Sequence, residues 1–410
     1  MNHLDVPAFL GVLFVMLGSA KLFGYLARRA GQPSVLGELI AGVVVGRSVL
    51  GVVDPSGDVL HLLGELGVVI LLFSIGLETD LKRLLKAGPA ATAVALAGVF
   101  LPFVCGYAAA RLLGLSNLVA VVTGAAMTAT SVGITGRVLA DLGRLNDPEG
   151  QVILGAAILD DVVGLVILSI VAGLTEGREV SIGSVAWTAA SAFGFLVGTL
   201  VVGRFVMPLV VRATARLDLP GTPAILALML AFGLGWLADR AGSAVIIGAF
   251  AAGLLVVGTP RFHDVELGVT RLGHFFVPLF FVTVGAAVDV STLNPFDRAN
   301  HRTLAIAVVL TVVAAATKFA AGYAPFWFKG RKSLIGAGMI PRGEVGLIFA
   351  QMGLTGGVFD RGMFAVVTVV VMATTFVAPP LIKWLAPPVP GLAPGRHEDQ
   401  DGIEDLATEG

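Results

Sequence analysis

Long hydrophobic runs separated by short polar connections extend over most of this chain. Runs such as Val6–Ala27, Pro89–Leu113 and Leu304–Phe328 reach or exceed the ~20 residues with which a helix spans a bilayer core. The pattern predicts an all-α polytopic membrane protein with about thirteen transmembrane helices and no soluble domain between them. The helices are expected at residues 6–27, 33–50, 59–77, 89–113, 117–143, 150–174, 182–211, 221–238, 242–258, 270–288, 303–328, 332–355 and 361–386.

The composition supports a membrane protein. Of the 410 residues, 56% are hydrophobic and 13% are charged, whereas an ordinary soluble domain has about 25% charged residues. Most of the surface therefore does not face water. The formal net charge of −1 gives no indication of nucleic-acid binding, and we expect neither a cofactor nor an enzymatic activity.

Lysine and arginine residues are more frequent after the odd-numbered spans than after the even-numbered ones. Arg28 and Arg29 follow the first span and Lys82 follows the third, whereas Arg47 follows the second. Positively charged loops tend to stay in the cytoplasm. We therefore expect a prokaryotic inner-membrane protein with its N-terminus outside and its C-terminus in the cytoplasm. Residues 387–410 are predicted to form a short, disordered acidic tail.

The two halves of the chain resemble each other at an offset of roughly 210 residues. Gly24–Gly31 matches Gly235–Gly242, and further glycines and charged residues match at similar offsets. The copies begin at the first and eighth predicted helices, so an odd number of spans separates them. This predicts two inverted six-helix repeats joined by a linker helix. Inverted repeats are typical of secondary transporters, which favours a carrier over a receptor or an enzyme.

Two adjacent carboxylates, Asp160 and Asp161, lie in the middle of the sixth predicted span. An ionisable residue in the bilayer centre is costly, and this predicts a functional site. Burial and mutual repulsion both oppose ionisation of the pair unless a cation is bound. Oxygen ligands also suit a hard monovalent cation. The pair is therefore predicted to bind a monovalent cation in exchange for protons, although carboxylates held in structural ion pairs would show the same sequence.

Lys318 lies well inside the eleventh predicted span. A buried lysine needs a carboxylate partner, for which Asp160 and Asp161 are the candidates. A buried lysine also loses its proton readily, so Lys318 is a candidate proton carrier as well as a candidate structural residue.

Two predicted spans contain residues that interrupt helices. Pro341 cannot donate a helical hydrogen bond and clashes with the carbonyl four residues before it, so the twelfth helix should break. In the fifth span, hydroxyl groups can replace backbone partners at a break; they belong to Thr128, Thr130 and Ser131. The repeat places these spans opposite each other, which predicts crossing discontinuous helices. Arg342 and Glu344 could then neutralise the ends of the half-helix dipoles.

Other charged residues in the spans are assigned structural roles. Lys21, Glu38 and Glu65 are expected to connect helices or to extend toward the membrane surface. His274 and Arg137 are likewise expected to be structural.

Together these motifs resemble the second cation:proton antiporter family, which includes bacterial sodium/proton exchangers and Kef-type potassium/proton exchangers. The resemblance extends over nearly all of residues 1–386. It is carried by the following motifs: Gly31–Glu38, Gly64–Gly67, Gly76–Glu78, Leu159–Asp161, Lys318 and Pro341–Glu344.

The resemblance implies a role for each residue of the site. Asp160 would form an ion pair with Lys318, Asp161 would be the principal cation ligand, and the threonine and serine run would belong to the crossing helices. It also implies a homodimer in the lipid membrane whose core moves like an elevator. The implied division is a dimerisation part at 1–80 and 220–300, a core transport part at 85–175 and 303–386, and a linker helix at 180–217.

The favoured hypothesis is electrogenic exchange of Na⁺, or of Li⁺ or K⁺, for more than one H⁺. Kef-type members tend to carry an amide where Asp160 stands, which favours the sodium type. Electroneutral K⁺/H⁺ exchange is the alternative within the same class. A cation-coupled symporter of an organic anion is disfavoured, because an anion would not be placed beside paired carboxylates. A non-transporting sensor is a further alternative.

Overall fold

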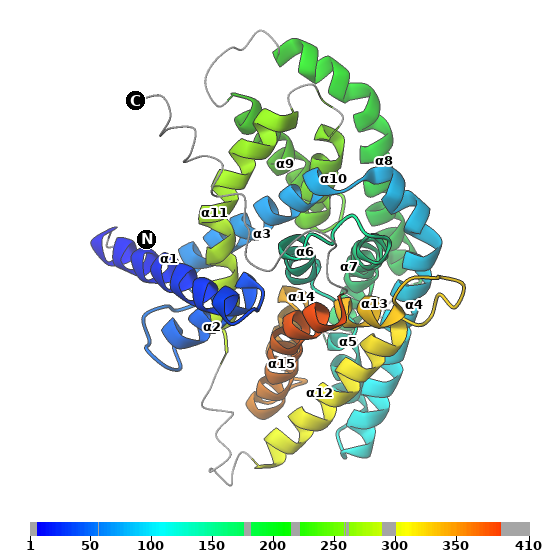
Figure 1. Cartoon of the computed structure of the whole chain (residues 1–410). Helices are drawn as coiled ribbons and strands as arrows, with labels where there is room; N and C mark the ends of the chain where they lie inside the picture. Colours follow the sequence, from blue (N-terminus) through cyan, green and yellow to red (C-terminus); the bar gives the residue numbers. More distant parts are fainter. Residues whose placement is uncertain are drawn as a thin grey trace.

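A computed structural model of the protein describes residues 6–55, 57–175, 182–214, 222–257, 259, 262–288 and 301–386. This part of the chain is helical (Figure 1). Its fifteen helices are α1 (Val6–Arg29), α2 (Ser34–Val45), α3 (Asp58–Glu78), α4 (Leu81–Leu112), α5 (Asn117–Ala126), α6 (Val132–Asp141), α7 (Pro148–Thr175), α8 (Ile182–Thr214), α9 (Thr222–Arg240), α10 (Val245–Val256), α11 (Phe262–Ala286), α12 (His301–Ala321), α13 (Lys332–Gly338), α14 (Glu344–Thr355) and α15 (Arg361–Leu385). The predicted acidic tail at 387–410 lies outside the described residues.

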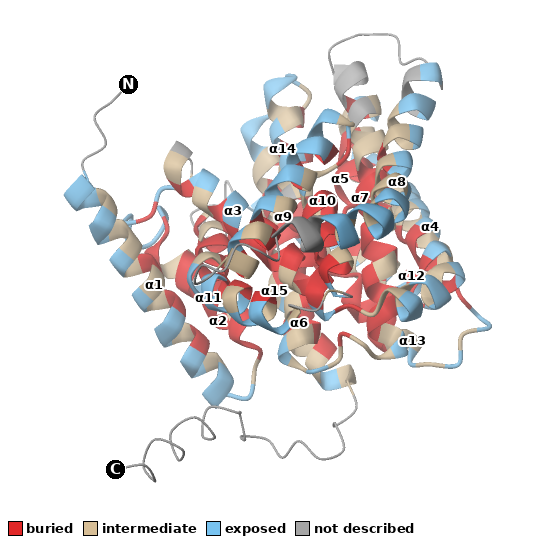
Figure 2. Cartoon of the chain, turned by 90° about the horizontal axis from the view of Figure 1, so that it is seen from above, coloured by how far each residue is buried: buried red, intermediate tan, exposed pale blue. Residues whose placement is uncertain are grey.

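Nine helices within the described residues are long and apolar enough to cross a membrane: α1, α3, α4, α7, α8, α9, α11, α12 and α15. Buried residues gather in the centre of the bundle, and exposed residues form its periphery (Figure 2). Large apolar side chains such as Phe14, Phe205 and Trp384 are among the exposed ones. An exposed surface of this kind suits lipid, and the prediction of a multi-pass membrane protein is confirmed.

The helices form two groups that are best distinguished by their packing. In the first, which we call the scaffold group, α11 packs on α3 and α2, α10 packs on α3 and α9, and α1 packs on α2. In the second, the core group, α4 packs on α7, α5 and α12, and α15 packs on α12, α13 and α14. We include α6 in the core group because it follows α5 and packs on α7 and α15; it also contacts α3 and α2 of the scaffold group. The long helix α8 contacts α10 of the scaffold group and α7 of the core group. α8 covers most of the predicted linker at 180–217.

Glycines bring the backbones of the scaffold helices into contact at two matching places. A Cβ atom added at Gly42 of α2 would lie 2.3 Å from the carbonyl oxygen of Val282 in α11. A Cβ atom added at Gly253 of α10 would lie 2.4 Å from the carbonyl oxygen of Phe73 in α3. Gly42 and Gly253 have the same offset along the chain as Gly24–Gly31 and Gly235–Gly242, so the sequence repeat pairs them. Each half of the chain therefore contributes a short helix that crosses a long helix of the other half.

The turns before these two short helices also correspond. Gly31 and Gly242 have φ angles of 70° and 73°, in the left-handed region that favours glycine. Gly31 lies between α1 and α2, and Gly242 lies between α9 and α10. Both α2 and α10 have 12 residues. Residues that match in the sequence thus have the same local structure in both halves.

The close crossing of α10 and α3 predicts that Gly253→Ala will destabilise the protein. The added methyl group would overlap the Phe73 carbonyl oxygen, and such overpacking typically costs about 1–3 kcal/mol. We expect a lower melting temperature for the purified variant in detergent. Gly233→Ala in α9 is the matched control, because no heavy atom lies within 4 Å of its added Cβ. Equal melting temperatures for the two variants would contradict the close crossing.

Candidate functional site

Two helical segments of the core group are interrupted, and their interruptions meet. The first segment ends as α5 at Ala126 and resumes as α6 at Val132, and the second ends as α13 at Gly338 and resumes as α14 at Glu344. The backbone N–H of Ser131 donates a hydrogen bond of 2.8 Å to the carbonyl oxygen of Pro341. The breaks lie where the sequence predicted them, and each supplies a backbone partner to the other.

Threonine hydroxyl groups bond to further backbone carbonyls around the breaks. Thr128 Oγ1 donates to the Ala125 carbonyl oxygen at 2.8 Å, within its own segment. Thr135 Oγ1 donates to the Gly338 carbonyl oxygen at 2.8 Å, at the end of α13. In a membrane, backbone groups released by a helix break must find such partners inside the protein. The hydroxyls therefore stabilise the interrupted conformation.

The fully buried Arg342 side chain connects three parts of the core group. Its Nη2 atom donates to the carbonyl oxygens of Met127 at 2.7 Å and Ala314 at 3.3 Å, and its Nη1 atom donates to Ile340 O at 3.2 Å. Met127 is the C-cap residue of α5. A positive charge at the carboxyl end of a helix opposes the negative end of its dipole. Arg342 thus stabilises the end of a half-helix inside the bundle.

Lys318 of α12 reaches the same place and forms an ion pair there. Its Nζ atom lies 2.8 Å from Oδ2 of Asp160 in α7 and donates to Thr130 Oγ1 at 2.6 Å. Lys318 is 0% and Asp160 is 2% exposed, so the pair is removed from water. The other carboxylate oxygen, Asp160 Oδ1, is buried and accepts no hydrogen bond from the described protein groups. It remains available as an acceptor at the edge of the pair.

Asp161 is the next residue of α7 and is also buried, at 8% exposure. Successive residues of a helix point about 100° apart around its axis. The two carboxylates therefore face different neighbours, and the ion pair with Lys318 is formed by Asp160. The Asp161 carboxylate therefore lies next to the Asp160–Lys318 ion pair along α7 but in a different environment.

The structure brings most of the predicted site residues into one cluster. Asp160, Lys318 and Thr130 are in direct contact, and Ser131 is joined to Pro341 at the crossing. The break around them also contains the predicted residues Thr128 and Arg342. Glu344 begins α14, but its side chain lies outside the described residues.

Two contributors were not singled out in the sequence. Thr135 bonds the end of α13, and Thr375 Oγ1 of α15 donates to the carbonyl oxygen of Arg342. Thr135 continues the hydroxyl-rich run of its segment, and Thr374-Thr375 is a polar pair inside an apolar span. Both signals could have been found, although neither indicates which carbonyl is bound.

Interrupted helices that meet inside a membrane-spanning bundle are typical of secondary transporters. The fold and the site define this class of membrane protein. The family described as sodium/hydrogen exchanger, transmembrane, matches residues 14–387. The chain belongs to this family, which confirms the resemblance found in the sequence.

Several relatives with assigned names are similar to this chain, two of them over most of their own length. The high-affinity Na⁺/H⁺ antiporter NhaS3 of Synechocystis is 39% identical, with 90% of this chain and 88% of that protein covered. The Na⁺/H⁺-K⁺ antiporter GerN of Bacillus cereus is 36% identical, with 93% and 97% covered. The glutathione-regulated potassium-efflux protein KefC of Escherichia coli is 32% identical, with 68% of this chain and 46% of that protein covered.

The fold is similar to a solved antiporter structure. The sodium/proton antiporter MjNhaP1 of Methanocaldococcus jannaschii superposes with a TM-score of 0.70 at 18% sequence identity. The superposition covers 94% of this chain and 96% of that chain. The two chains therefore share a fold over most of their length.

Proposed function

We propose that this protein is a secondary active transporter that exchanges Na⁺ for more than one H⁺ by alternating access. The observation that carries the proposal is the buried Lys318–Asp160 pair with Asp161 beside it at the crossing of two interrupted helices. Similar relatives that are named Na⁺/H⁺ antiporters support Na⁺ and H⁺ as the substrates. The protein would act in a prokaryotic inner membrane, with its N-terminus outside.

The proposed cycle uses three ionisable groups. Asp161 is protonated when no cation is bound and releases its proton when Na⁺ arrives, because burial favours the neutral acid and the cation favours the carboxylate. Na⁺ also draws Asp160 away from Lys318, which then loses a proton of its own. Two protons would leave for each sodium ion, and one net charge would cross the membrane in each cycle.

The proposed movement is that of an elevator. The scaffold group corresponds to the dimerisation parts at 1–80 and 220–300, and the core group corresponds to the transport parts at 85–175 and 303–386. α8 would connect them as the linker helix. We propose that the two halves are inverted repeats with thirteen crossings in total and that the scaffold groups of two copies form a homodimer. The matched glycine crossings of α2 and α10 support the repeat.

Exchange of K⁺ for H⁺ is the second candidate. GerN is named a Na⁺/H⁺-K⁺ antiporter and KefC a potassium-efflux protein, so relatives of both types are similar to this chain. An electroneutral cycle would keep Lys318–Asp160 as a permanent structural pair. Rates measured with Na⁺, Li⁺ and K⁺ in the same vesicles would distinguish the two candidates.

Asp161→Asn should abolish exchange while the protein remains folded, because the amide can neither release a proton nor carry a negative charge. The measurement is the collapse of a preset pH gradient in proteoliposomes that contain a trapped pH dye, on addition of Na⁺. Asp239→Asn, at the exposed end of α9, is the matched control and should exchange normally. Sodium-driven proton flux by the Asp161→Asn variant at the wild-type rate would remove Asp161 from the mechanism.

The membrane voltage should drive exchange, because each cycle moves one net charge across the membrane. Moving one charge changes the free energy by about 2.3 kcal/mol per 100 mV. The measurement is Na⁺/H⁺ exchange in proteoliposomes at membrane voltages set by potassium and valinomycin. Removing one partner of a buried ion pair destabilises a protein, so the test variant replaces both. Asp160→Asn with Lys318→Gln should exchange without voltage dependence or far more slowly. If the rate and the end-point of Na⁺/H⁺ exchange by the wild type do not change with the membrane voltage, the electrogenic cycle is contradicted.

One hydrogen bond between the two groups allows a test of the elevator movement. Ser34 Oγ of α2 donates to Asp141 Oδ2 of α6 at 2.8 Å. In a Cys105→Ser background, oxidation of the Ser34→Cys, Asp141→Cys variant should stop exchange, and reduction should restore it. Ser48→Cys with Val288→Cys is the control, because Ser48 Oγ bonds Val288 O within the scaffold group. Undiminished exchange by the fully cross-linked first variant would exclude movement of α6 against α2.

A further inference from the structure

A cavity of about 860 Å³ lies apart from the acid–amine pair, between α1, α2, α6 and α11. It is bounded by scaffold helices and by one helix of the core group. Its charged and ionisable lining residues are Lys21, Arg28, Arg29, Glu38, Arg137 and His274. Four of these are permanently cationic, and one is a carboxylate. The lining therefore carries an excess of positive charge.

Contacts within the protein do not remove this excess. Arg137 Nε lies 3.1 Å from Asp141 Oδ1, and Asp141 also accepts the hydrogen bond of Ser34. The Asp141 carboxylate thus already pairs with Arg137 of its own helix and accepts a hydrogen bond from α2. Glu38, at 5% exposure, is the carboxylate left to balance the cations of α1, and its buried Oε2 atom accepts no hydrogen bond from the described protein groups.

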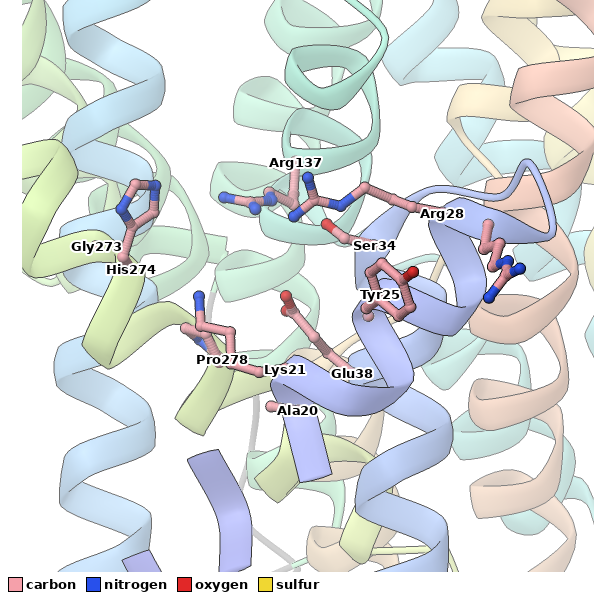
Figure 3. A pocket seen from close by; sticks show the side chains of 12 residues that line it. Ala20, Lys21, Tyr25, Arg28, Ser34, Glu38, Arg137, Gly273, His274 and Pro278 are labelled. Atoms are coloured by element: carbon pink, nitrogen blue, oxygen red, sulfur yellow. The ribbon is translucent and has the colours of Figure 1, made fainter. Parts of the chain in front are cut away.

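The side chains converge on the cavity from several helices (Figure 3). Arg28 of α1 extends toward Arg137 of α6, while Lys21 and Glu38 project into the space beside them and His274 enters from α11. Arg137, Asp141, Lys21 and Arg28 are the charged groups that act on Glu38. Several like charges directed at one space are stabilised by an anion that enters it.

The ends of a helix that crosses a bilayer lie near the lipid headgroups. α1 ends at Arg29 and α2 begins at Ser34, so the cavity opens at one end of a membrane-spanning helix. Lys21 lies two turns deeper, about 10 Å along the helix. Neighbouring apolar side chains of α1 that do not line the cavity, Leu22 and Leu26, are exposed. An acyl chain could pack there while its headgroup occupies the cavity.

We propose that this cavity binds the phosphate headgroup of an anionic phospholipid. Basic pockets between transmembrane helices on the cytoplasmic side suit such headgroups, and the excess of Lys and Arg assigns this end of α1 to that side. A cation on its way to the site would be repelled by the same lining. The headgroup would contact α1 and α2 of the scaffold group and Arg137 of α6. The inference concerns binding alone and does not depend on the exchange proposed above.

The experiment measures lipid binding to the purified protein by native mass spectrometry and by the melting temperature in detergent. The probes are phosphatidylglycerol, phosphatidylcholine and inorganic phosphate. Phosphatidylglycerol should be retained and should raise the melting temperature, and the other two should do neither. Lys21→Gln with Arg28→Gln should weaken the binding of phosphatidylglycerol by roughly tenfold or more, because each cation contributes to the attraction.

Two variants act as controls. Lys86→Gln removes an exposed cation of α4 that does not line the cavity, and it should bind like the wild type. Lys21→Arg with Arg28→Lys keeps both charges and should retain most of the binding. Equal retention of phosphatidylcholine, or equal loss of binding in the Lys86→Gln variant, would overturn the proposal. If inorganic phosphate raises the melting temperature as much as phosphatidylglycerol does, the cavity is a site for small anions and the lipid proposal is wrong. The comparison of the three probes uses the wild-type protein alone. It therefore tests the proposal even if a variant does not fold.

Discussion

Unsatisfied backbone groups are the constraint on which the arrangement of this site depends. A helix interrupted inside a bilayer releases N–H and C=O groups, each of which costs several kcal/mol if it finds no partner. Here the two interruptions supply partners to each other, and Arg342 binds carbonyls of α5 and α12. The carboxylate, amine and hydroxyl groups of the site are held between these helix ends. A change at the crossing would therefore displace the acid–amine pair and the hydroxyl groups around it together.

Stability alone does not account for the buried ion pair. Desolvation of two buried charges offsets much of their attraction, so a pair such as Lys318–Asp160 contributes little net stability compared with apolar residues of similar volume. In the cycle that we propose, the pair would separate when a cation binds. Thr130 Oγ1 accepts a hydrogen bond from Lys318 Nζ, and its hydroxyl also lies 3.4 Å from the Met339 carbonyl oxygen. Thr130 belongs to the first interruption and Met339 to the second, so a change in the position or charge of the amine would alter contacts at both. Charge and backbone geometry are thus coupled at one hydroxyl.

The sequence predicted the helices and the breaks because their signals are local. Pro341 removes a helical donor wherever it stands, and an intramembrane Asp160–Asp161 pair is improbable without a role. The partners were harder to predict, because they depend on contacts between distant segments. Arg342 was expected to oppose a helix dipole, but its bonds to Met127 and Ala314 follow from the crossing of three helices. The cationic cavity was missed for the same reason, since its residues come from four helices and each alone is typical of a membrane interface.

Packing differs within the scaffold group and between the two groups. The backbones of α2 and α11 are in contact at Gly42, and those of α10 and α3 are in contact at Gly253. A shift at either place would force a carbonyl oxygen into the neighbouring helix. α6 meets α3 through aliphatic side chains instead: Gly133 faces Leu71, and Gly136 faces Ile75. Side-chain contacts can slide by small rotamer changes, whereas interlocked backbones cannot. The proposed movement of the core group would therefore take place at the contacts between α6 and α3, and it would have to break the polar contacts at the end of α6, such as the hydrogen bond from Ser34 to Asp141.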